Sequence, residues 1–322
     1  MLVVTVLVSL APPASADDLP KQRPVAIIAG AQGDVQLKTG SNDWQKGYPL
    51  DLLRPDTYVK CGTDGQAVII FLYDDHRETI GPNSEGQVAF RSITKMSGSL
   101  KSEPAKNGGN EFNIPYVGQL KLNQGMFTHA DDAGEQKTED TFLSAYVEVT
   151  TYPPIFHWAD VGQKPYRLQL FDDAKQFIYE AKVPLTTYRF PYKPPFRLIK
   201  SGLYYWQVLA PNNNLVVGQY DFRLLTLPLV KFIAQQEKLY NAIQAKQKGD
   251  TVSATELFLV FNQYHTLDKL VHLLQDWRTN QPDNPEVYRY LTRAYLLKGC
   301  PFHARQALQQ EIRLGGTDPV QP

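Results

Sequence analysis

The sequence predicts a multidomain protein with an N-terminal all-β domain, a central β-sandwich and C-terminal α-helical hairpin repeats. Over residues 25–93, short β-rich runs alternate with Gly, Asp and Asn breaks, which is typical of a small antiparallel β domain. Over residues 146–225, candidate strands recur about every ten residues with turn signals between them. From residue 228 to residue 314, apolar residues recur at intervals of three and four, which indicates amphipathic helices.

The composition excludes several classes of protein. Lys and Arg together number 33, and Asp and Glu number 33, so the formal net charge is zero, whereas nucleic-acid binders normally carry a basic excess. Hydrophobic residues make up 43% and charged residues 20%, which fits neither a disordered chain nor a membrane-spanning one. Two cysteines are too few for a disulfide scaffold or a Cys-rich zinc module. We therefore expect no nucleic-acid partner and no direct membrane span.

The N-terminus is typical of an export signal. Residues 2–11 form a ten-residue apolar run, followed by Pro12-Pro13 and by the small residues Ala14 and Ala16 at the positions that signal peptidase requires. The run is shorter than the roughly 20 apolar residues that cross a bilayer. We predict a signal peptide over residues 1–16 and an exported, periplasmic protein. Export removes the chain from cytoplasmic ATP and NAD, so we expect no cofactor.

The first β domain is predicted over residues 25–128. Residues 33–38 alternate apolar and polar side chains, residues 68–73 form an apolar run of strand length, and Asp74-Asp75 supply a turn. This region resembles the FecR-like domain, a β-rich extracytoplasmic module, in five segments: residues 33–35, 49–50, 55–67, 71–75 and 80–84. The Gly-, Ser- and Asn-rich residues 97–111 are predicted to be a mobile loop, and residues 116–127 one more hairpin.

The central sandwich is predicted over residues 146–225. Its expected strands cover residues 147–149, 156–158, 166–171, 176–182, 203–210 and 216–223. Tyr204, Trp206, Val208 and Ala210 alternate, so we expect them to share one face, with Trp158 from the opposing sheet packed on Trp206. The strand around Trp206 and the segment leading to Trp158 resemble a fibronectin type III-like module.

The helical block is predicted over residues 228–314, with a leading helix that ends at Gly249-Asp250. A 34-residue period aligns Leu257 with Leu291, Phe261 with Tyr295, Leu274 with Leu308, and Trp277 with Glu311. The later copy resembles the tetratricopeptide repeat at Pro285, Tyr288, Leu291, Ala294, Tyr295, Gly299, Ala304 and Leu308. We count one convincing repeat and one plausible repeat.

Candidate catalytic and metal-binding clusters all have simpler explanations. Three consecutive residues, Asp74-Asp75-His76, cannot converge on one ion, so we expect a solvated turn. His157 is expected at the rim of the sandwich, and Cys300 and His303 are expected to pack in the ordinary way. His265 and His272 are seven positions apart, too far for the zinc spacing of helices. We therefore predict no catalytic, cofactor-binding or metal-binding residues.

Two further features concern cysteines and aromatic residues. Nothing in the sequence brings Cys61 and Cys300 together, so we expect two separate buried thiols. The aromatic stretch over residues 188–192 raises carbohydrate binding as a minor option, with an ordered interstrand loop as the simpler interpretation.

The expected function is therefore recognition rather than catalysis. Fewer than three helical repeats are present, so their exposed face must dock on the sandwich or on a partner. We call the set Leu257, Phe261, Tyr264, Tyr288, Leu291 and Tyr295 the predicted partner region. The preferred hypothesis is a non-enzymatic exported envelope protein that binds another protein or an envelope polymer. The alternatives are a FecR-type sensory component working with a membrane partner, and an envelope hydrolase with scattered catalytic residues.

Overall fold

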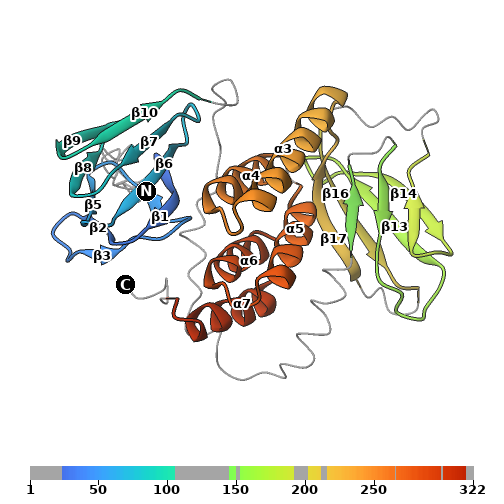
Figure 1. Ribbon diagram of the computed structural model, residues 1–322. Helices are drawn as coiled ribbons and strands as arrows, with labels where there is room; N and C mark the ends of the chain where they lie inside the picture. Colours follow the sequence, from blue (N-terminus) through green and yellow to red (C-terminus); the bar gives the residue numbers. More distant parts are fainter. Residues whose placement is uncertain are drawn as a thin grey trace, which may run out of the picture. The chain divides into compact units, whose positions relative to one another are not determined.

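The structure is a computed structural model that describes residues 24–105, 145–149, 153–191, 202–211, 216–264, 266–298 and 300–316. The chain divides into two compact units, Met1–Glu111 and Phe112–Pro322. Antiparallel β-sheets occupy residues 26–223 and five helices occupy residues 227–313, which confirms the predicted fold class (Figure 1). The predicted signal peptide and the hairpin expected over residues 116–127 lie outside the described residues.

The N-terminal unit contains two five-stranded antiparallel sheets. One has the strand order β10-β7-β6-β1-β4 and the other β3-β2-β5-β8-β9. Their strands are β1 (Ala26–Gln32), β2 (Val35–Thr39), β3 (Gln45–Lys46), β4 (Leu52–Leu53), β5 (Thr57–Cys61), β6 (Gln66–Phe71), β7 (Arg77–Ile80), β8 (Ser84–Val88), β9 (Ile93–Ser97) and β10 (Leu100–Glu103). Both predicted strand segments, residues 33–38 and 68–73, therefore overlap observed strands.

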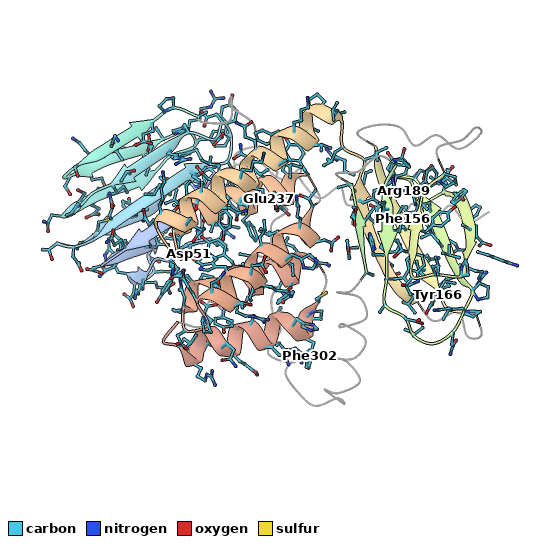
Figure 2. The ribbon with its side chains drawn as sticks, turned by 45° about the vertical axis from the view of Figure 1, so that its right-hand side comes forward. Asp51, Phe156, Tyr166, Arg189, Glu237 and Phe302 are labelled. Carbon is cyan, nitrogen blue, oxygen red and sulfur yellow. The ribbon has the colours of Figure 1, made fainter. Side chains whose placement is uncertain are left out.

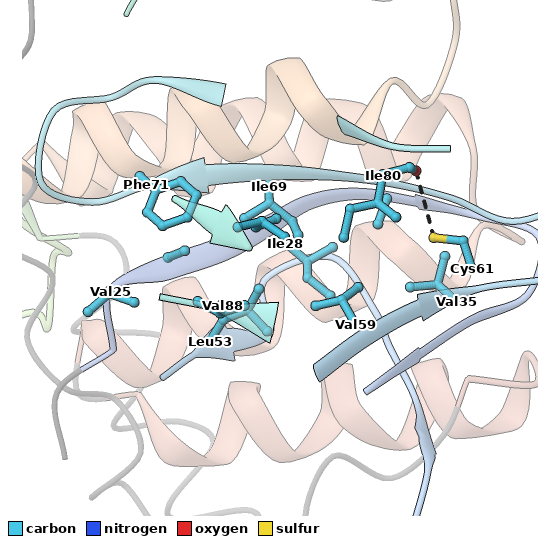
Figure 3. Packing of buried hydrophobic residues seen from close by; sticks show 13 residues of the cluster. Val25, Ile28, Val35, Leu53, Val59, Cys61, Ile69, Phe71, Ile80 and Val88 are labelled. Atoms are coloured by element: carbon cyan, nitrogen blue, oxygen red, sulfur yellow. Dashed lines mark hydrogen bonds between the residues drawn. The ribbon is translucent and has the colours of Figure 1, made fainter. Parts of the chain in front are cut away.

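Alternate residues of these strands form a single apolar cluster. Val35, Val59 and Cys61 contribute from the second sheet, while Ile69 and Phe71 contribute from β6 of the first (Figure 3). All five are at most 1% exposed, so the packed side chains of the two sheets exclude water. The Cys61 thiol donates to the carbonyl oxygen of Ile80 at 3.7 Å, which gives its buried S–H a partner.

The mobile loop predicted over residues 97–111 is wrong for its first part. Leu100–Glu103 form the edge strand β10, which pairs with Arg77–Ile80 in β7. Gly98 turns the chain at a φ of +72°, and the Ser99 amide donates to Ser84 Oγ at 2.7 Å. Lys and Ser suit this strand because an edge exposes its side chains to solvent, so a polar sequence did not mean an absence of pairing.

The described residues of the central region form seven strands in two antiparallel sheets, with orders β11-β12-β15 and β14-β13-β16-β17. The strands are β11 (Tyr146–Glu148), β12 (Ile155–His157), β13 (Tyr166–Phe171), β14 (Phe177–Val183), β15 (Thr187–Arg189), β16 (Leu203–Leu209) and β17 (Val216–Arg223). The strand β15 corrects the interstrand loop expected there, because Thr187–Arg189 pair with β12.

Aromatic rings join the two sheets of the sandwich. Phe156 of β12, labelled in Figure 2, lies 5.3 Å from Trp206 of β16 and 5.4 Å from Phe222 of β17, measured between ring centroids. Tyr204, Trp206, Val208 and Ala210 are all buried, which confirms the predicted alternation. The expected partner of Trp206 differs, however. Phe156 and Trp158 point to the same side of the chain, and the strand position brings Phe156 onto Trp206 while Trp158 packs on Tyr166 at 5.8 Å.

The helical region has a 34-residue repeat. Its helices are α3 (Leu227–Lys246), α4 (Thr251–Gln263), α5 (Leu267–Asn280), α6 (Pro285–Leu297) and α7 (Pro301–Arg313). Helix α6 begins and ends 34 positions after α4, and α7 begins 34 positions after α5. The predicted equivalent pairs Leu257 with Leu291, Phe261 with Tyr295, Leu274 with Leu308, and Trp277 with Glu311 are all buried. The two hairpins therefore use equivalent positions for their cores.

Equivalent side chains also begin the first helix of each hairpin. Asp250 accepts a hydrogen bond from the Ser253 amide at the start of α4, and Asn284 accepts one from the Glu286 amide at the start of α6. Each bond satisfies a backbone donor that the helix itself leaves unpaired. Within the described part of the chain, no helix combines the length and the apolar character needed to span a membrane.

Candidate binding site

The structure divides the predicted partner region into core and surface. Leu257, Phe261, Leu291 and Tyr295 are at most 4% exposed, so they hold the helices together. Only Tyr264 and Tyr288 are partly exposed. Helical periodicity identified the inward face of α4 and α6, and most of that face is occupied by intramolecular packing.

Three members of the predicted partner region, Tyr288, Leu291 and Tyr295, line one groove of about 540 Å³. We call it the α5–α7 groove, because α5 contributes Arg278 and α7 contributes residues on the other side, among them Gln306 and Arg313. Leu257, Phe261 and Tyr264 do not line it. Apolar periodicity in the sequence therefore identified one wall of this groove. It did not identify the Arg and Gln residues of α5 and α7, because these polar residues show no apolar periodicity.

The charge of the α5–α7 groove is one-sided. Arg278 and Arg313 are exposed and have no ion-pair partner among the described residues, and no Asp or Glu lines the groove. Each arginine lies in the last turn of its helix, where its positive charge interacts favourably with the negative end of the helix dipole. The groove therefore suits a polar or negatively charged segment, since an exposed guanidinium can form bidentate hydrogen bonds with a carboxylate.

The walls of the groove are fixed by hydrogen bonds and packing. The Tyr288 hydroxyl donates to the carbonyl oxygen of Pro282 at 2.8 Å, and Gln275 Nε2 donates to the Tyr295 hydroxyl at 3.2 Å. The ring of His303 lies 5.5 Å from that of Tyr295, so the predicted packing role of His303 is confirmed. These contacts hold the aromatic wall in one conformation before any partner arrives.

A buried ion pair fixes α6 against α7 next to this groove. Arg289 Nε donates to Glu311 Oε1 at 2.7 Å, and Glu286 Oε2 lies 3.5 Å from Arg289 Nη1. Burial raises the pKa of Glu311, and the positive charge of Arg289 opposes that rise. The first hairpin has Thr255 and Trp277 at the equivalent positions, so this pair belongs to the second hairpin alone.

The turn around His76 is partly buried, with the side chain of His76 14% exposed and that of Asp74 40% exposed, which corrects the expectation of a solvated turn. Asp75 is 1% exposed and adopts a φ of +65°, and the nearby Glu78 is 5% exposed. His76 Nδ1 is hydrogen-bonded to Asp74 Oδ1, while His76 Nε2 lies 3.8 Å from Glu78 Oε1. The sequence pattern missed this arrangement because the left-handed residue tightens the turn and brings the strand residue Glu78 beside the turn histidine.

The side chains of this cluster are joined by ring stacking and hydrogen bonds. Phe71 stacks on His76 with ring centroids 4.5 Å apart, and Glu78 Oε2 accepts a hydrogen bond from the Ile93 amide at 2.5 Å. Burial raises the pKa of Glu78, while the Ile93 amide and His76 oppose the rise. Among the described residues, no three His, Cys, Asp or Glu side chains form a group that could hold a metal ion.

His157 lies at the edge of the sandwich and is engaged on both ring nitrogens. Nε2 lies 2.8 Å from Glu148 Oε1, and Nδ1 lies 3.4 Å from Thr187 Oγ1. Its ring stacks on Tyr146 at 4.4 Å, and the edge of Tyr146 meets His272 of α5 at 6.0 Å. With a side chain 22% exposed, His157 is the rim residue that was predicted. His265 lies outside the described residues.

The aromatic stretch considered for carbohydrate binding packs within the sandwich. The hydroxyls of Tyr188 and Tyr179 are hydrogen-bonded to each other, and Phe190, which is 2% exposed, lies 5.1 Å from Tyr179. Burial and the Tyr179 hydroxyl raise the pKa of Tyr188. These rings link β14 to β15 and leave little aromatic face for a sugar; Tyr192 lies outside the described residues.

Comparisons with known proteins do not assign this chain to a family. No family model matches the chain, and no curated protein matches it. The FecR-like, fibronectin type III-like and tetratricopeptide-like resemblances thus remain expectations that rest on the residues quoted for them. The described residues form antiparallel β-sheet units followed by two equivalent helical hairpins with a basic groove.

Proposed function

We propose that this chain is a non-enzymatic exported envelope protein that acts as a binding or scaffold module for another protein or an envelope polymer. The α5–α7 groove carries this proposal, because it combines two exposed arginines with a rigid aromatic wall. Its occupant is a polar segment with carboxylate groups, since no acidic side chain of the groove opposes one.

The remainder of the chain supports a role in recognition. The FecR-like resemblance and the predicted signal peptide both favour an extracytoplasmic location. A sheet unit with its own apolar core, such as the N-terminal one, can fold independently of the element that binds. The side chains around His76 and His157 are engaged in hydrogen bonds, ion pairs and stacking, which favours structural roles for them.

A site-specific photo-cross-link tests this proposal in the full chain. Gln306 is exposed and lines the groove, so replacing it with p-benzoylphenylalanine places the cross-linker at the expected interface. We expect a discrete cross-linked product with one partner in the envelope fraction. The exported chain in this product should begin at Asp17, after removal of the signal peptide. The double variant Arg278→Glu/Arg313→Glu should lose at least about tenfold of the product, because it reverses the groove's charge.

Lys231→Glu/Lys238→Glu is the matched control, because it makes the same charge change at exposed positions of α3 outside the groove. Equal cross-linking in both double variants, or retention of the chain in the cytosol, would refute the proposal. A membrane-bound regulator as the captured partner would favour the sensory alternative instead.

A further inference from the structure

A second groove lies between α3 and α5 and shares no residue with the α5–α7 groove. It has a volume of about 540 Å³ and is lined on one side by Tyr240 and Asn241 of α3, and on the other by Asp276, Trp277 and Asn280 of α5. Figure 2 labels Glu237, a further lining residue on α3. We call this site the α3–α5 groove. None of the predicted partner region lines it.

Two lining side chains carry buried polar atoms that have no hydrogen-bond partner among the described residues. They are the hydroxyl of Tyr240 and the indole nitrogen of Trp277, and each side chain is 95% buried. A nearby tyrosine shows the ordinary outcome: the Tyr290 hydroxyl is paired with Thr255 Oγ1 at 2.6 Å and with the Thr251 carbonyl oxygen at 2.9 Å. The indole nitrogens of Trp158 and Trp206 are buried and unpaired among the described residues too, so the feature specific to this groove is that Tyr240 and Trp277, each with an unpaired buried donor, both line it.

Both unpaired groups can act as donors. The indole nitrogen only donates. Burial, and then the negative charges of Asp250 and Asp276, raise the pKa of Tyr240, so its hydroxyl keeps its proton. The occupant of the groove must therefore supply acceptor atoms.

The charges around the groove favour a neutral occupant. Asp276 is exposed on the lining, and it would repel a carboxylate or a phosphate. Glu237 is already paired with Lys269, so Lys248 is the cation that remains on this lining. The exposed carboxamide of Asn241 can donate to a carbonyl and accept from an amide, which matches both polar groups of a peptide unit.

We propose that the α3–α5 groove binds an extended, uncharged polypeptide segment whose backbone carbonyl oxygens accept hydrogen bonds from the Tyr240 hydroxyl and the Trp277 indole. A neutral glycan fits less well, because sugars stack on exposed aromatic faces, whereas the Trp277 ring is buried and packs against Tyr290 at 5.6 Å. Both donor atoms are closed to bulk water in the free protein, so binding must move the side chains that cover them. This interaction is separate from the proposed function.

Selection of random nine-residue peptides displayed on phage, with the full chain as bait, tests the proposal. We expect enriched peptides that lack Asp and Glu. Tyr240→Phe should bind them about tenfold more weakly, because it removes one hydrogen bond in a buried site. The same variant should unfold at an equal or higher temperature, because the hydroxyl that it removes has no partner in the free protein. Trp277→Phe, which removes the second donor, should also weaken binding.

Tyr290→Phe is the matched control, since it removes a hydroxyl that is paired between α4 and α6 of the same helical region. It should lower the unfolding temperature and leave peptide affinity within about twofold. The charge-reversed Arg278→Glu/Arg313→Glu chain should bind the peptides with unchanged affinity. This result would show that the peptides bind the α3–α5 groove and not the α5–α7 groove. The absence of enriched peptides, equal binding by Tyr240→Phe, or Tyr240-dependent binding of chitohexaose in place of peptides would overturn the proposal.

Discussion

Arg289 and Glu311 form an ion pair whose side chains are 6% and 1% exposed, with Arg289 Nη2 and Glu311 Oε1 2.6 Å apart. Two charges removed from water cost little only while they remain paired. Glu311→Leu should therefore lower the free energy of unfolding of the helical region by about 3–5 kcal/mol, because it removes the buried carboxylate that pairs with the Arg289 guanidinium. Urea unfolding followed by helical circular dichroism measures this change.

The double variant Arg289→Met/Glu311→Leu is the control for that prediction. It removes both charges and restores apolar packing, so most of the lost stability should return. A double variant as unstable as Glu311→Leu would show that the side-chain volumes, and not the unpaired charge, determine the effect.

The two N-caps spaced 34 residues apart should contribute equally. Asp250→Ala and Asn284→Ala each remove a side-chain acceptor from the first turn of a helix, so each should cost about 1 kcal/mol. Thr226→Ala is the comparison, because Thr226 precedes α3 without making a side-chain cap bond and should change stability little. Helical circular dichroism in urea distinguishes the three variants, and an equal loss for Thr226→Ala would contradict the prediction.

The sandwich core depends on the ring of Phe156. Phe156→Ala removes the contacts to Trp206 and Phe222 and leaves a cavity between the sheets, so it should cost about 3–5 kcal/mol. Phe177→Ala, at a side chain 57% exposed on β14, should cost less than about 1 kcal/mol. Tryptophan fluorescence in urea reports the transition, and similar losses for both variants would refute the assignment of the core.

The thiol of Cys61 should be unreactive in the folded protein. Burial, with a smaller contribution from the charge of Asp34, raises the pKa of Cys61 to about 11. At pH 8 only about one thiol in a thousand is then ionised, and the thiolate is the reactive form. Iodoacetamide should label Cys61 in urea and leave it unlabelled in buffer, as read by peptide mass spectrometry.

An exposed cysteine provides the control for labelling. Ser41→Cys, in the same unit, should react completely under native conditions. Cys300 is likewise a buried thiol outside any disulfide, in agreement with the predicted separate thiols, so it should also resist labelling. Rapid native labelling of Cys61, or a peptide containing a Cys61–Cys300 cross-link, would contradict this description.

Glu78 should make the N-terminal unit less stable as pH rises above the acid range. Its pKa is raised in the folded protein mainly by burial, so the folded state binds this proton more tightly than the unfolded state. The resulting stabilisation is complete below the ordinary pKa of 4.5 and is lost as pH rises through the raised pKa. Hydrogen exchange of the Ile93 amide, corrected for intrinsic exchange, measures it, and Glu78→Gln should flatten the dependence. An unchanged slope in that variant would assign the effect to another group.

Local sequence patterns predicted much of the secondary structure. The alternation at Trp206 identified an inward strand face, and the 34-residue period aligned the cores of two hairpins. Such patterns succeed because a strand or helix exposes each side chain with a fixed period, whatever it packs against. The same patterns treated polar residues 97–103 as a loop, because β10 is an edge strand whose polar side chains carry no apolar signal.

The predicted partner region shows the limit of this reasoning most clearly. Periodicity placed Leu291 and Tyr295 on the inward face of α6, but it could not say which neighbouring helix covers that face. Only the packing of α7 showed that these residues are core and that Arg278 and Arg313 share a groove with Tyr288.

The amino-acid sequence by itself determined the order of β-sheet and helical segments and which face of each segment is apolar. The tertiary structure alone decided which polar groups became neighbours: Arg289 with Glu311, His76 with Glu78, and Tyr240 with Trp277 across one groove. The physical reason is that periodicity arises within one segment, whereas burial of a charge or a donor depends on atoms from segments distant in the chain.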